Sequence, residues 1–483
     1  MPDEAKTYDL VIIGGGPAGI TAAATATDQK KTVAMVDCQH ARGGASFSAG
    51  TIPSKTLRET AILLSASKTR NLPGFAITLQ PEVVVSDYVT REQNIRALFN
   101  QAFQSGIKSH LAEVFNGNAT FVDPHTVSVT LTPGKDGQAA SSEPILLRGE
   151  NILIATGSSP IRSAMFPFAN GNVYDSDTIP TLHRVPKSIA IIGSGVIGSE
   201  YGCTFAALGA KVHIIDVRDK LLPFLDAEVS QALTSTIENA GVTFHWNESV
   251  LKCEELPSGE IALKLSSGDS LNVNAVLVAM GRKGNTQALN LAAAGVKAGD
   301  FGVIPVDHDY RTNVPHIFAA GDVIGFPALA STSMEQARRA ARHALGLAVN
   351  SLSPLLPIGI YTMPEVSMVG ETEESLQQEH VEYVAGRARY TDSACGLLVG
   401  DKNGFLKLIV RRDNMQLVGV HVMGERATEL IHIGLMAMRF GASVLTFSET
   451  CFNVPTLGEL YKVAAQDALR QIAETEMGIP SFF

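Results

Sequence analysis

A strand–turn–helix–strand pattern that occurs twice constrains this chain more than any other feature of its sequence. The first copy is YDLVIIGGGPAGITAAATATDQKKTVAMVDC, with Gly14, Gly16, Gly19 and Asp37; the second is SIAIIGSGVIGSEYGCTFAALGAKVHIIDV, with Gly193, Gly195, Gly198 and Asp216. Each has G-x-G-x-x-G spacing after an apolar run and before a helix-forming segment, and the acid follows 23 residues after the first glycine. A lone glycine pattern is a weak signal, but two copies in this full context predict two dinucleotide-binding units.

The residue types in these units fit a pyrophosphate. Glycine allows a tight turn and lets the backbone approach the phosphates, which lie at the amino end of the following helix. Asp37 and Asp216 can each accept a hydrogen bond from a ribose 2′-hydroxyl, which in the second unit favours NAD. Arg218 could instead bind a 2′-phosphate and favour NADP. Having both in IIDVRD is compatible with use of both dinucleotides, provided that the arginine screens the aspartate or the aspartate turns away.

Bulk properties exclude several classes of protein. A chain of 483 residues is long enough for about three or four domains. The net charge of −10 argues against nucleic acid as a partner. There is no run of 18 apolar residues, so we expect no membrane span. The first residues, MPDEAKTYDL, lack the basic and apolar regions of a secretory signal, so we expect a cytoplasmic protein.

The cysteines give no sign of a redox or metal centre. Cys38, Cys203, Cys253, Cys395 and Cys451 are scattered without CxxC spacing. This pattern argues against a zinc ribbon, provides no local redox pair and leads us to expect no metal site. We expect these residues to be small buried hydrophobic side chains.

Phrases spread along the chain point to a family. In order they are GGGPAG, GTIPSK, ATGSSP, GSGVIGSE, AMGR, AAGD and FNVPTLGE. This series resembles the flavoprotein disulfide reductases that bind two dinucleotides, such as dihydrolipoamide dehydrogenase and glutathione reductase, and the resemblance covers nearly the whole chain. It implies FAD in the first glycine unit, NADH or NADPH in the second, and a homodimer or higher homo-oligomer formed through the last domain.

Longer phrases outside the cofactor motifs narrow the resemblance. They are YDSDTI, GRKGNT, GDVIGFPALAS, PIGIYTMPEVSMVG, GERATELIHIG and FNVPTLGELYKVAA. These are similar to the soluble pyridine nucleotide transhydrogenases, which use FAD to pass hydride between NADPH and NAD⁺. The resemblance therefore implies FAD, NAD and NADP as cofactors, with the nicotinamide dinucleotides as the partners that bind and leave.

The expected fold class is α/β, with two Rossmann-like dinucleotide-binding domains and a C-terminal α+β dimerisation domain. Residues 1–155 are expected to form the first segment of the FAD domain and residues 284–352 the central segment that completes it. Residues 156–283 are expected to form the NAD(P) domain and residues 353–483 the dimerisation domain. The polar stretch 133–145, PGKDGQAASSEPI, is predicted to be an exposed hairpin loop.

The resemblance also implies roles for individual residues. Lys55 is expected beside flavin N5, and Glu200 is expected to pair with it near the nicotinamide, so both are catalytic candidates. Thr51 is a third candidate, which either donates a hydrogen bond near the flavin or fills the space of a sulfur. Asp322 is expected to contact the ribityl or phosphate part of FAD. The expected FAD-binding residues are Gly14, Gly16, Gly19, Asp37, Gly44, Ser46, Lys55, Ala119, Thr156, Gly157, Asp322, Leu329 and Ala330. The expected NAD(P)-binding residues are Gly193, Gly195, Gly198, Glu200, Asp216, Arg218 and Gly281.

Three positions depart from the disulfide reductases. Those enzymes carry Cys-x4-Cys immediately before IPSK, where this chain has Ser46 and Thr51, whereas the transhydrogenases keep the first cysteine. The histidine base of the phrase H-P-T-x-x-E is replaced by Val454, while Glu459 remains. Reducing a disulfide needs a thiolate, a second thiol and a base, so these losses argue against dithiol chemistry. Cys451 lies near this phrase, but no second cysteine is close to it in sequence, so we expect it to have no redox role.

Hydride transfer requires less of the protein than dithiol chemistry does. It needs a dry site that orients a nicotinamide on a flavin. The leading interpretation is an FAD-dependent transhydrogenase. An NAD(P)H:quinone oxidoreductase would share the first half-reaction with another acceptor, and a non-catalytic flavoprotein that senses the NADPH/NADP⁺ ratio is the third interpretation. Retention of both nucleotide units with Lys55 and Glu200 favours an enzyme.

Overall fold

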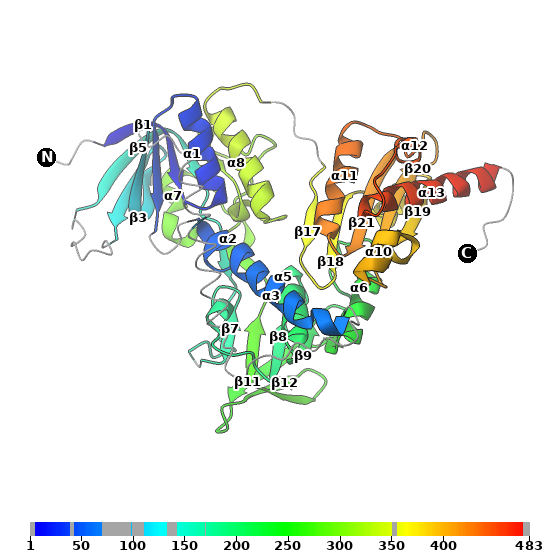
Figure 1. Ribbon diagram of the computed structural model, residues 1–483. Helices are drawn as coiled ribbons and strands as arrows, with labels where there is room; N and C mark the ends of the chain where they lie inside the picture. The colour runs from blue at the N-terminus through cyan, green and yellow to red at the C-terminus, as the bar shows by residue number, and fades with distance from the viewer. Residues whose placement is uncertain are drawn as a thin grey trace.

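The computed structural model describes residues 5–38, 43–69, 98, 111–132, 143–169, 171–349 and 355–476. Figure 1 shows three bodies: an N-terminal unit at the left, a second unit at the bottom and a C-terminal unit at the right. Helix α8 (Ala330–Ala344) returns to the first unit after the second, so the first unit is built from two segments of the chain. This arrangement confirms the predicted α/β fold class. None of the described helices combines the length and the apolar character needed to cross a bilayer.

The first unit contains a parallel sheet with an antiparallel extension. Its strands are β1 (Lys6–Ile13), β2 (Val33–Asp37), β3 (Ala112–Asp123), β4 (Thr126–Leu131), β5 (Ile145–Ile154) and β16 (Ile317–Ala319). Strands β3, β2, β1, β5 and β16 lie side by side in parallel, while β4 pairs antiparallel with β3 and β5. The apolar residues 10–13 are buried, as expected of a central parallel strand. Of the predicted loop between β4 and β5, residues 133–142 lie outside the described part of the chain.

Helices cover this sheet and extend toward the second unit. They are α1 (Pro17–Asp28), α2 (Gly44–Ser48), α3 (Thr51–Thr69), α7 (Leu291–Ala294) and α8, with 3₁₀ turns at Gln287–Leu289, Asp300–Gly302 and Asp322–Ile324. Helices α1 and α8 pack closely because their facing side chains are small, and Ala22, Ala26, Ala337 and Ala340 are fully buried between them and the sheet. Helix α3 leaves the first unit and packs against α5 (Val196–Ala207) of the second (Figure 1).

Two short strands mark where the chain crosses between the first two units. Strand β6 (Ser158–Pro160) leaves the first unit, β15 (Arg282–Gly284) returns to it, and the two pair antiparallel. The guanidinium of Arg282 holds them together by donating hydrogen bonds to the hydroxyl and the backbone oxygen of Ser158. The expected domain divisions stay predictions: the one after residue 155 precedes β6, and the one after residue 283 falls within β15.

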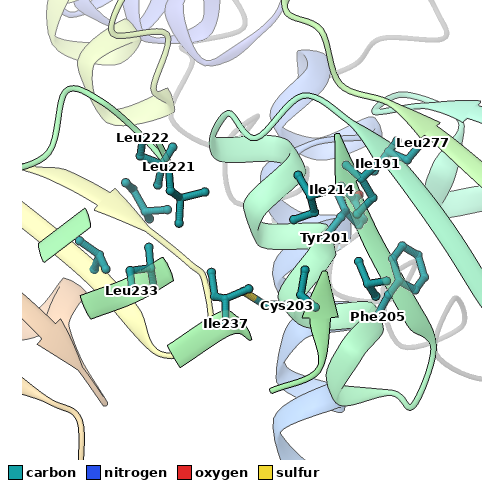
Figure 2. Close-up of a cluster of buried hydrophobic side chains, with 14 of the residues drawn as sticks. Ile191, Tyr201, Cys203, Phe205, Ile214, Leu221, Leu222, Leu233, Ile237 and Leu277 are labelled. Carbon is teal, nitrogen blue, oxygen red and sulfur yellow. The ribbon is translucent and has the colours of Figure 1, made fainter. Parts of the chain in front are cut away.

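The second unit repeats the architecture of the first. Its parallel sheet has the order β10-β9-β8-β14-β7, and β11, β12 and β13 form a separate antiparallel sheet. The elements are β7 (Val173–Asp175), a 3₁₀ turn (Ile179–Thr181), β8 (Ser188–Ile192), α5, β9 (Lys211–Asp216), α6 (Ala227–Asn239), β10 (Val242–Trp246), β11 (Val250–Glu255), β12 (Ile261–Leu265), β13 (Ser270–Val273) and β14 (Ala275–Val278). Figure 2 shows its core, where Tyr201 and Cys203 of α5 lie among side chains of the sheet and of α6. Burial raises the pKa of the Cys203 thiol to about 12, so Cys203 is a hydrophobic core residue, as predicted.

The C-terminal unit is an antiparallel sheet covered by helices. Its sheet has the order β17-β18-β21-β20-β19. The elements are β17 (Ile358–Ile360), β18 (Glu365–Gly370), α9 (Glu373–Gln378), β19 (Tyr383–Arg389), a 3₁₀ turn (Tyr390–Asp392), α10 (Ala394–Val399), β20 (Phe405–Arg411), β21 (Leu417–Gly424), α11 (Ala427–Arg439), α12 (Leu445–Glu449), a 3₁₀ turn (Leu457–Glu459) and α13 (Leu460–Glu476). Large apolar side chains are exposed on α11 and after it, among them Met436, Phe440 and Val454. Exposed apolar surface of this kind is typical of a subunit interface.

A buried cluster of charges joins the second unit to the C-terminal unit. Lys407 of β20 is 1% exposed, and its ammonium lies 2.8 Å from an oxygen of Asp226 and 2.9 Å from an oxygen of Glu228, both at the start of α6. Glu373 of α9 pairs with the same ammonium, and Arg387 of β19 pairs with Glu228 and Glu373. The three carboxylates are close enough to hold a metal ion, but Lys407 already supplies a positive charge between them.

Lys407→Met is expected to destabilise the protein strongly. Methionine nearly matches the length of lysine but leaves three carboxylates without their buried cation, and removing one partner of a buried ion pair costs about 3–5 kcal/mol. Thermal unfolding of the variant should begin at a lower temperature than that of the wild type. Lys402→Met, which changes an exposed lysine just before β20, should have little effect. Equal unfolding temperatures for Lys407→Met and the wild type would contradict a stabilising role for the cluster.

Candidate functional site

The turn after β1 is built around two close backbone approaches. Gly14 adopts a φ of +114°, and a Cβ on it would lie 2.2 Å from the carbonyl oxygen of Ala155. A Cβ on Gly19 would lie 1.9 Å from the carbonyl oxygen of Gly14. Helix α1 therefore begins directly against the turn, and only glycine permits both approaches. The helix starts at Pro17 without a side-chain cap, so its first backbone N–H groups are available to a phosphate.

A cavity of about 420 Å³ opens at this turn, a volume typical of small-molecule sites. Among the residues expected to bind FAD, those that line it are Gly14, Gly16, Asp37, Gly44, Ser46, Ala119, Thr156, Gly157 and Asp322. The others lie elsewhere: Gly19 packs beneath the turn, Lys55 reaches α5, and Leu329 and Ala330 stand at the start of α8. The contacts of all these residues with FAD stay predictions.

Polar residues outside the predicted set complete the cavity wall. Asp322 accepts a hydrogen bond from the Ser158 hydroxyl at 2.9 Å. Asn285 donates to the backbone oxygen of Thr156 at 3.0 Å and accepts from the Ser159 hydroxyl at 2.7 Å. Ser158, Ser159 and Asn285 belong to the phrases ATGSSP and GRKGNT, at the two crossings between units. The two phrases could therefore have indicated these residues as part of the site. The spacing of the residues alone does not show that their side chains form hydrogen bonds across the cavity wall.

Thr156 indicates that the cavity suits a polar ligand. Its hydroxyl oxygen is buried and has no hydrogen-bond partner among the described residues, and the residue lines the cavity. A buried hydroxyl without a partner is costly unless a ligand supplies one. The glycine turn, the helix amino end and this hydroxyl together fit FAD, which carries a pyrophosphate and a polar ribityl chain.

The turn after β8 repeats the construction of the first turn. Gly193 adopts a φ of +105°, and a Cβ on it would lie 2.5 Å from the carbonyl oxygen of Ala279. A Cβ on Gly198 would lie 1.9 Å from the carbonyl oxygen of Gly193. Gly195, by contrast, has open space beside it at the amino end of α5, where a pyrophosphate can approach. Gly281 follows β14 with a φ of +114°, which glycine adopts without strain.

Asp216 lies at the end of β9, and both oxygens of its carboxylate are bound within the chain. Ser194 donates to Oδ2 through its backbone N–H at 2.6 Å and through its hydroxyl at 2.7 Å. Arg218 donates to Oδ1 through its backbone N–H and Nε, and to Oδ2 through Nη2 at 2.7 Å. Burial opposes ionisation of Asp216, but these hydrogen bonds outweigh it and hold the pKa of the carboxyl well below its usual range. Of the two arrangements expected for this pair, the structure has the arginine screening the aspartate.

Lys55 and Glu200 form an ion pair where the three units meet. Lys55 Nζ lies 2.5 Å from Glu200 Oε2, and the backbone N–H of Tyr361 donates to Glu200 Oε1 at 2.9 Å. The ammonium also lies 4.8 Å from the centre of the Tyr361 ring, a cation–π contact. Lys55 comes from α3, Glu200 from α5 and Tyr361 from the segment after β17. The expected pairing of the two charges is therefore formed, and its place beside flavin N5 stays a prediction.

The positions that carry redox groups in disulfide reductases hold other side chains here. Ser46 lines the first cavity, and Thr51 is exposed at the start of α3. Val454 is 68% exposed on the C-terminal unit. Cys451 near it is also exposed, so the expectation that the cysteines are buried is wrong for this residue, and Cys38 and Cys395 are only partly buried. Cys203 lies on the same helix as Glu200, but its raised pKa keeps it a protonated thiol. None of these groups supplies the thiolate and base that dithiol chemistry requires.

Two family descriptions match the sequence. Residues 8–344 match the pyridine nucleotide-disulphide oxidoreductase family, and residues 356–465 match the dimerisation domain of that family. The second match agrees with the predicted homodimer. Together the two matches extend from β1 of the first unit to the start of α13 in the C-terminal unit.

Curated relatives are similar to this chain over almost their full length. A protein of Mycobacterium bovis (strain BCG / Pasteur 1173P2) named soluble pyridine nucleotide transhydrogenase is 39% identical over 97% of this chain and 98% of the relative. Proteins with the same name from Chromohalobacter salexigens and Pseudomonas entomophila are 39% and 38% identical, each over 96% of this chain and 99% of the relative.

Solved structures share the fold at lower identity. LpdA from Mycobacterium tuberculosis superposes with a TM-score of 0.86 at 24% identity, over 97% of this chain and 100% of that chain. The Cu(II) complex of RclA, an HOCl-induced flavoprotein disulfide reductase from Escherichia coli, gives a TM-score of 0.84 at 24% identity, over 95% and 99%. At this identity the likeness shows the fold alone.

Gly19→Ala is expected to impair FAD binding. The added methyl group would meet the Gly14 carbonyl, so α1 must move away from the turn that forms the cavity. Overpacking of this kind costs about 1–3 kcal/mol, so the purified variant should carry several-fold less FAD than the wild type, measured by flavin absorbance per chain. Gly171→Ala, where open space surrounds the glycine, should keep its flavin. Full flavin content in Gly19→Ala would contradict the assignment of FAD to this turn.

Proposed function

The chain belongs to the pyridine nucleotide-disulphide oxidoreductase family, and on that premise we propose that it is an FAD-dependent transhydrogenase that passes hydride between NADPH and NAD⁺. One observation carries the proposal. The Lys55–Glu200 pair joins the two dinucleotide units, while Ser46, Thr51 and Val454 stand where dithiol chemistry would need two thiols and a base. The nearly full-length relatives named soluble pyridine nucleotide transhydrogenase support the same reaction.

FAD is proposed to bind at the first glycine turn, and the two nicotinamide dinucleotides are proposed to bind in succession at the second. When bound, FAD supplies the ring that accepts a hydride from one nicotinamide and returns it to another. A single nicotinamide site used twice gives ping-pong kinetics. The protein's part is to hold the rings in contact and to keep water out, which accounts for much of the barrier reduction in such reactions.

The Lys55–Glu200 pair is proposed to keep a fixed positive charge beside the flavin. Lys55 is held by Glu200 on one side and by the Tyr361 ring on another, so its ammonium has a defined position. A fixed cation stabilises the negative charge of a reduced ring without reorganisation during the reaction. Glu200 is 8% exposed and is itself held through its second oxygen by the Tyr361 backbone. Neither residue has to release a proton, which suits a reaction that moves only a hydride.

We propose the cytoplasm as the compartment. Cys203, Cys253, Cys395 and Cys451 are free thiols, which is the usual state of cysteine in a reducing compartment.

Glu200→Gln is expected to slow flavin reduction by NADPH. The amide keeps the shape of the carboxylate but removes the charge that positions Lys55, and a hydrogen bond to a charged group is worth about 1.5–3 kcal/mol, or about 10–100-fold in rate. Stopped-flow absorbance at saturating NADPH measures this rate. Flavin content should be unchanged, and Glu238→Gln, an exposed glutamate of α6, should reduce its flavin at the wild-type rate. A Glu200→Gln rate within twofold of the wild type would contradict the positioning role.

The reaction itself is tested by the reoxidation of a reduced flavin. The FAD-loaded protein is reduced anaerobically with NADPH, and one equivalent should suffice because no disulfide at positions 46 and 51 takes a second electron pair. NAD⁺ or a quinone is then added separately. Reoxidation by NAD⁺ should match the rate of turnover. Slow reoxidation by NAD⁺ with fast reoxidation by quinone would instead identify an NAD(P)H:quinone oxidoreductase, and a flavin that NADPH does not reduce would indicate a sensor.

A further inference from the structure

We infer that Ser194 and Arg218 together set the second dinucleotide site to accept both NADP(H) and NAD(H), because they occupy the carboxylate of Asp216 that would otherwise select NAD(H). Ser194 is then a specificity-determining residue, although it stands at an unspecified position of the G-x-G-x-x-G motif. The inference rests on the proposed function, since it concerns the site through which both dinucleotides would pass. It concerns recognition of the ribose, however, and not transfer of hydride.

An acid at the end of the second strand selects NAD(H) only while its oxygens can accept further hydrogen bonds. A free carboxylate accepts from the ribose 2′-hydroxyl and repels a 2′-phosphate. In Asp216, Oδ2 receives the backbone N–H and the hydroxyl of Ser194 together with Nη2 of Arg218, and Oδ1 receives two more donors from Arg218. A carboxylate has about four acceptor positions, so these donors fill it. A ribose hydroxyl must displace one of them before it can bind.

Arg218 binds Asp216 through one edge of its guanidinium and leaves the other edge open. Nε and Nη2 lie 2.9 Å and 2.7 Å from the carboxylate oxygens, the side chain is 43% exposed, and within the described chain Nη1 has no hydrogen-bond acceptor. A guanidinium has five N–H groups, so those of the outer edge remain for a phosphate. The pair has no net charge. A 2′-phosphate therefore meets an arginine whose partner acid is already neutralised.

In the first unit, a glycine occupies the position that corresponds to Ser194, so this position has no hydroxyl. Gly15 stands 22 residues before Asp37, as Ser194 stands 22 residues before Asp216. A Cβ on Gly15 would lie 2.5 Å from Asp37 Oδ2, so a serine would not fit there as Ser194 fits beside Asp216. FAD never carries a 2′-phosphate on its ribose. The unit expected to bind FAD thus lacks the hydroxyl, whereas the unit expected to bind a dinucleotide with or without a 2′-phosphate has it.

The test is a comparison of NAD⁺ and NADP⁺ binding to the oxidised, FAD-loaded protein, in which no hydride can move. Calorimetry gives the two dissociation constants, and the fluorescence of Trp246, the sole tryptophan and the residue paired with Asp216 across β9 and β10, gives a local readout. In the wild type the two constants should lie within about tenfold of each other. Ser194→Ala removes one of the three donors on Oδ2, so a ribose 2′-hydroxyl can take its place without displacing another donor. The ratio of affinities should therefore shift about 5–10-fold toward NAD⁺, as expected for one hydrogen bond.

Arg218→Leu and Ser199→Ala complete the experiment. Arg218→Leu removes the cation and should shift the ratio about 10–100-fold toward NAD⁺. Ser199→Ala removes a buried hydroxyl on α5 that bonds only to backbone oxygens of residues 194 and 195, so it should leave the ratio unchanged. An unchanged ratio in Ser194→Ala, or equal weakening of both dinucleotides, would overturn the inference. Slow reoxidation by NAD⁺ alongside the expected shift would reject the transhydrogenase reaction and leave the inference standing.

Discussion

Both dinucleotide sites depend on one steric constraint, the approach of the third glycine of each motif to the carbonyl oxygen of the first. A Cβ would lie 1.9 Å from that oxygen at Gly19 and at Gly198 alike. The contact brings the amino end of the helix against the turn, so that its first N–H groups and its dipole are directed at the same point in space. In the second unit, this contact also positions the side chain of Glu200. Glu200 follows Gly198 by two residues on α5, so the packing of the glycine determines where the carboxylate meets Lys55.

The same constraint explains what could be predicted from the sequence. A position that tolerates only glycine leaves a spaced pattern in the chain, so the two units, their sheets and the fold class could be recognised before the structure was known. Long-range polar contacts leave no such pattern. Tyr361 binds Glu200 through a backbone N–H, which nearly every residue type possesses, and Ser194 bonds to an acid 22 residues away. Lys407 lies in the strand FLKLIVR and could pass for a solvated lysine, yet acids up to 181 residues away in sequence surround it.

The loss of the thiols did not make the GTIPSK segment dispensable, because that segment also carries Lys55. Helix α3 begins at Thr51 and reaches from the first unit to α5 of the second, where Lys55 meets Glu200. Ser46 still lines the first cavity, and Gly44 before it still lies close to the turn of Gly16, where a Cβ would be 2.9 Å away. The segment therefore has two roles, to shape the proposed flavin site and to carry the charge of Lys55. Neither role requires a cysteine. A chain that transfers only hydride can keep the geometry and replace the cysteines.

The exchange of dinucleotides that we propose would occur in a second unit that is bound to the C-terminal unit at two separate places. Its helix α5 is bound to the C-terminal unit through Glu200 and the Tyr361 backbone, and its helix α6 is bound through Asp226 and Glu228 to Lys407. Two contacts on different helices resist both sliding and rotation, whereas either one alone would act as a pivot. The β6–β15 pair adds a third connection, to the first unit. With the unit restrained on these sides, we expect the proposed ligand to enter and leave past the side chains beside the second turn. The outer edge of Arg218, whose side chain is 43% exposed, is the group that would meet a 2′-phosphate there.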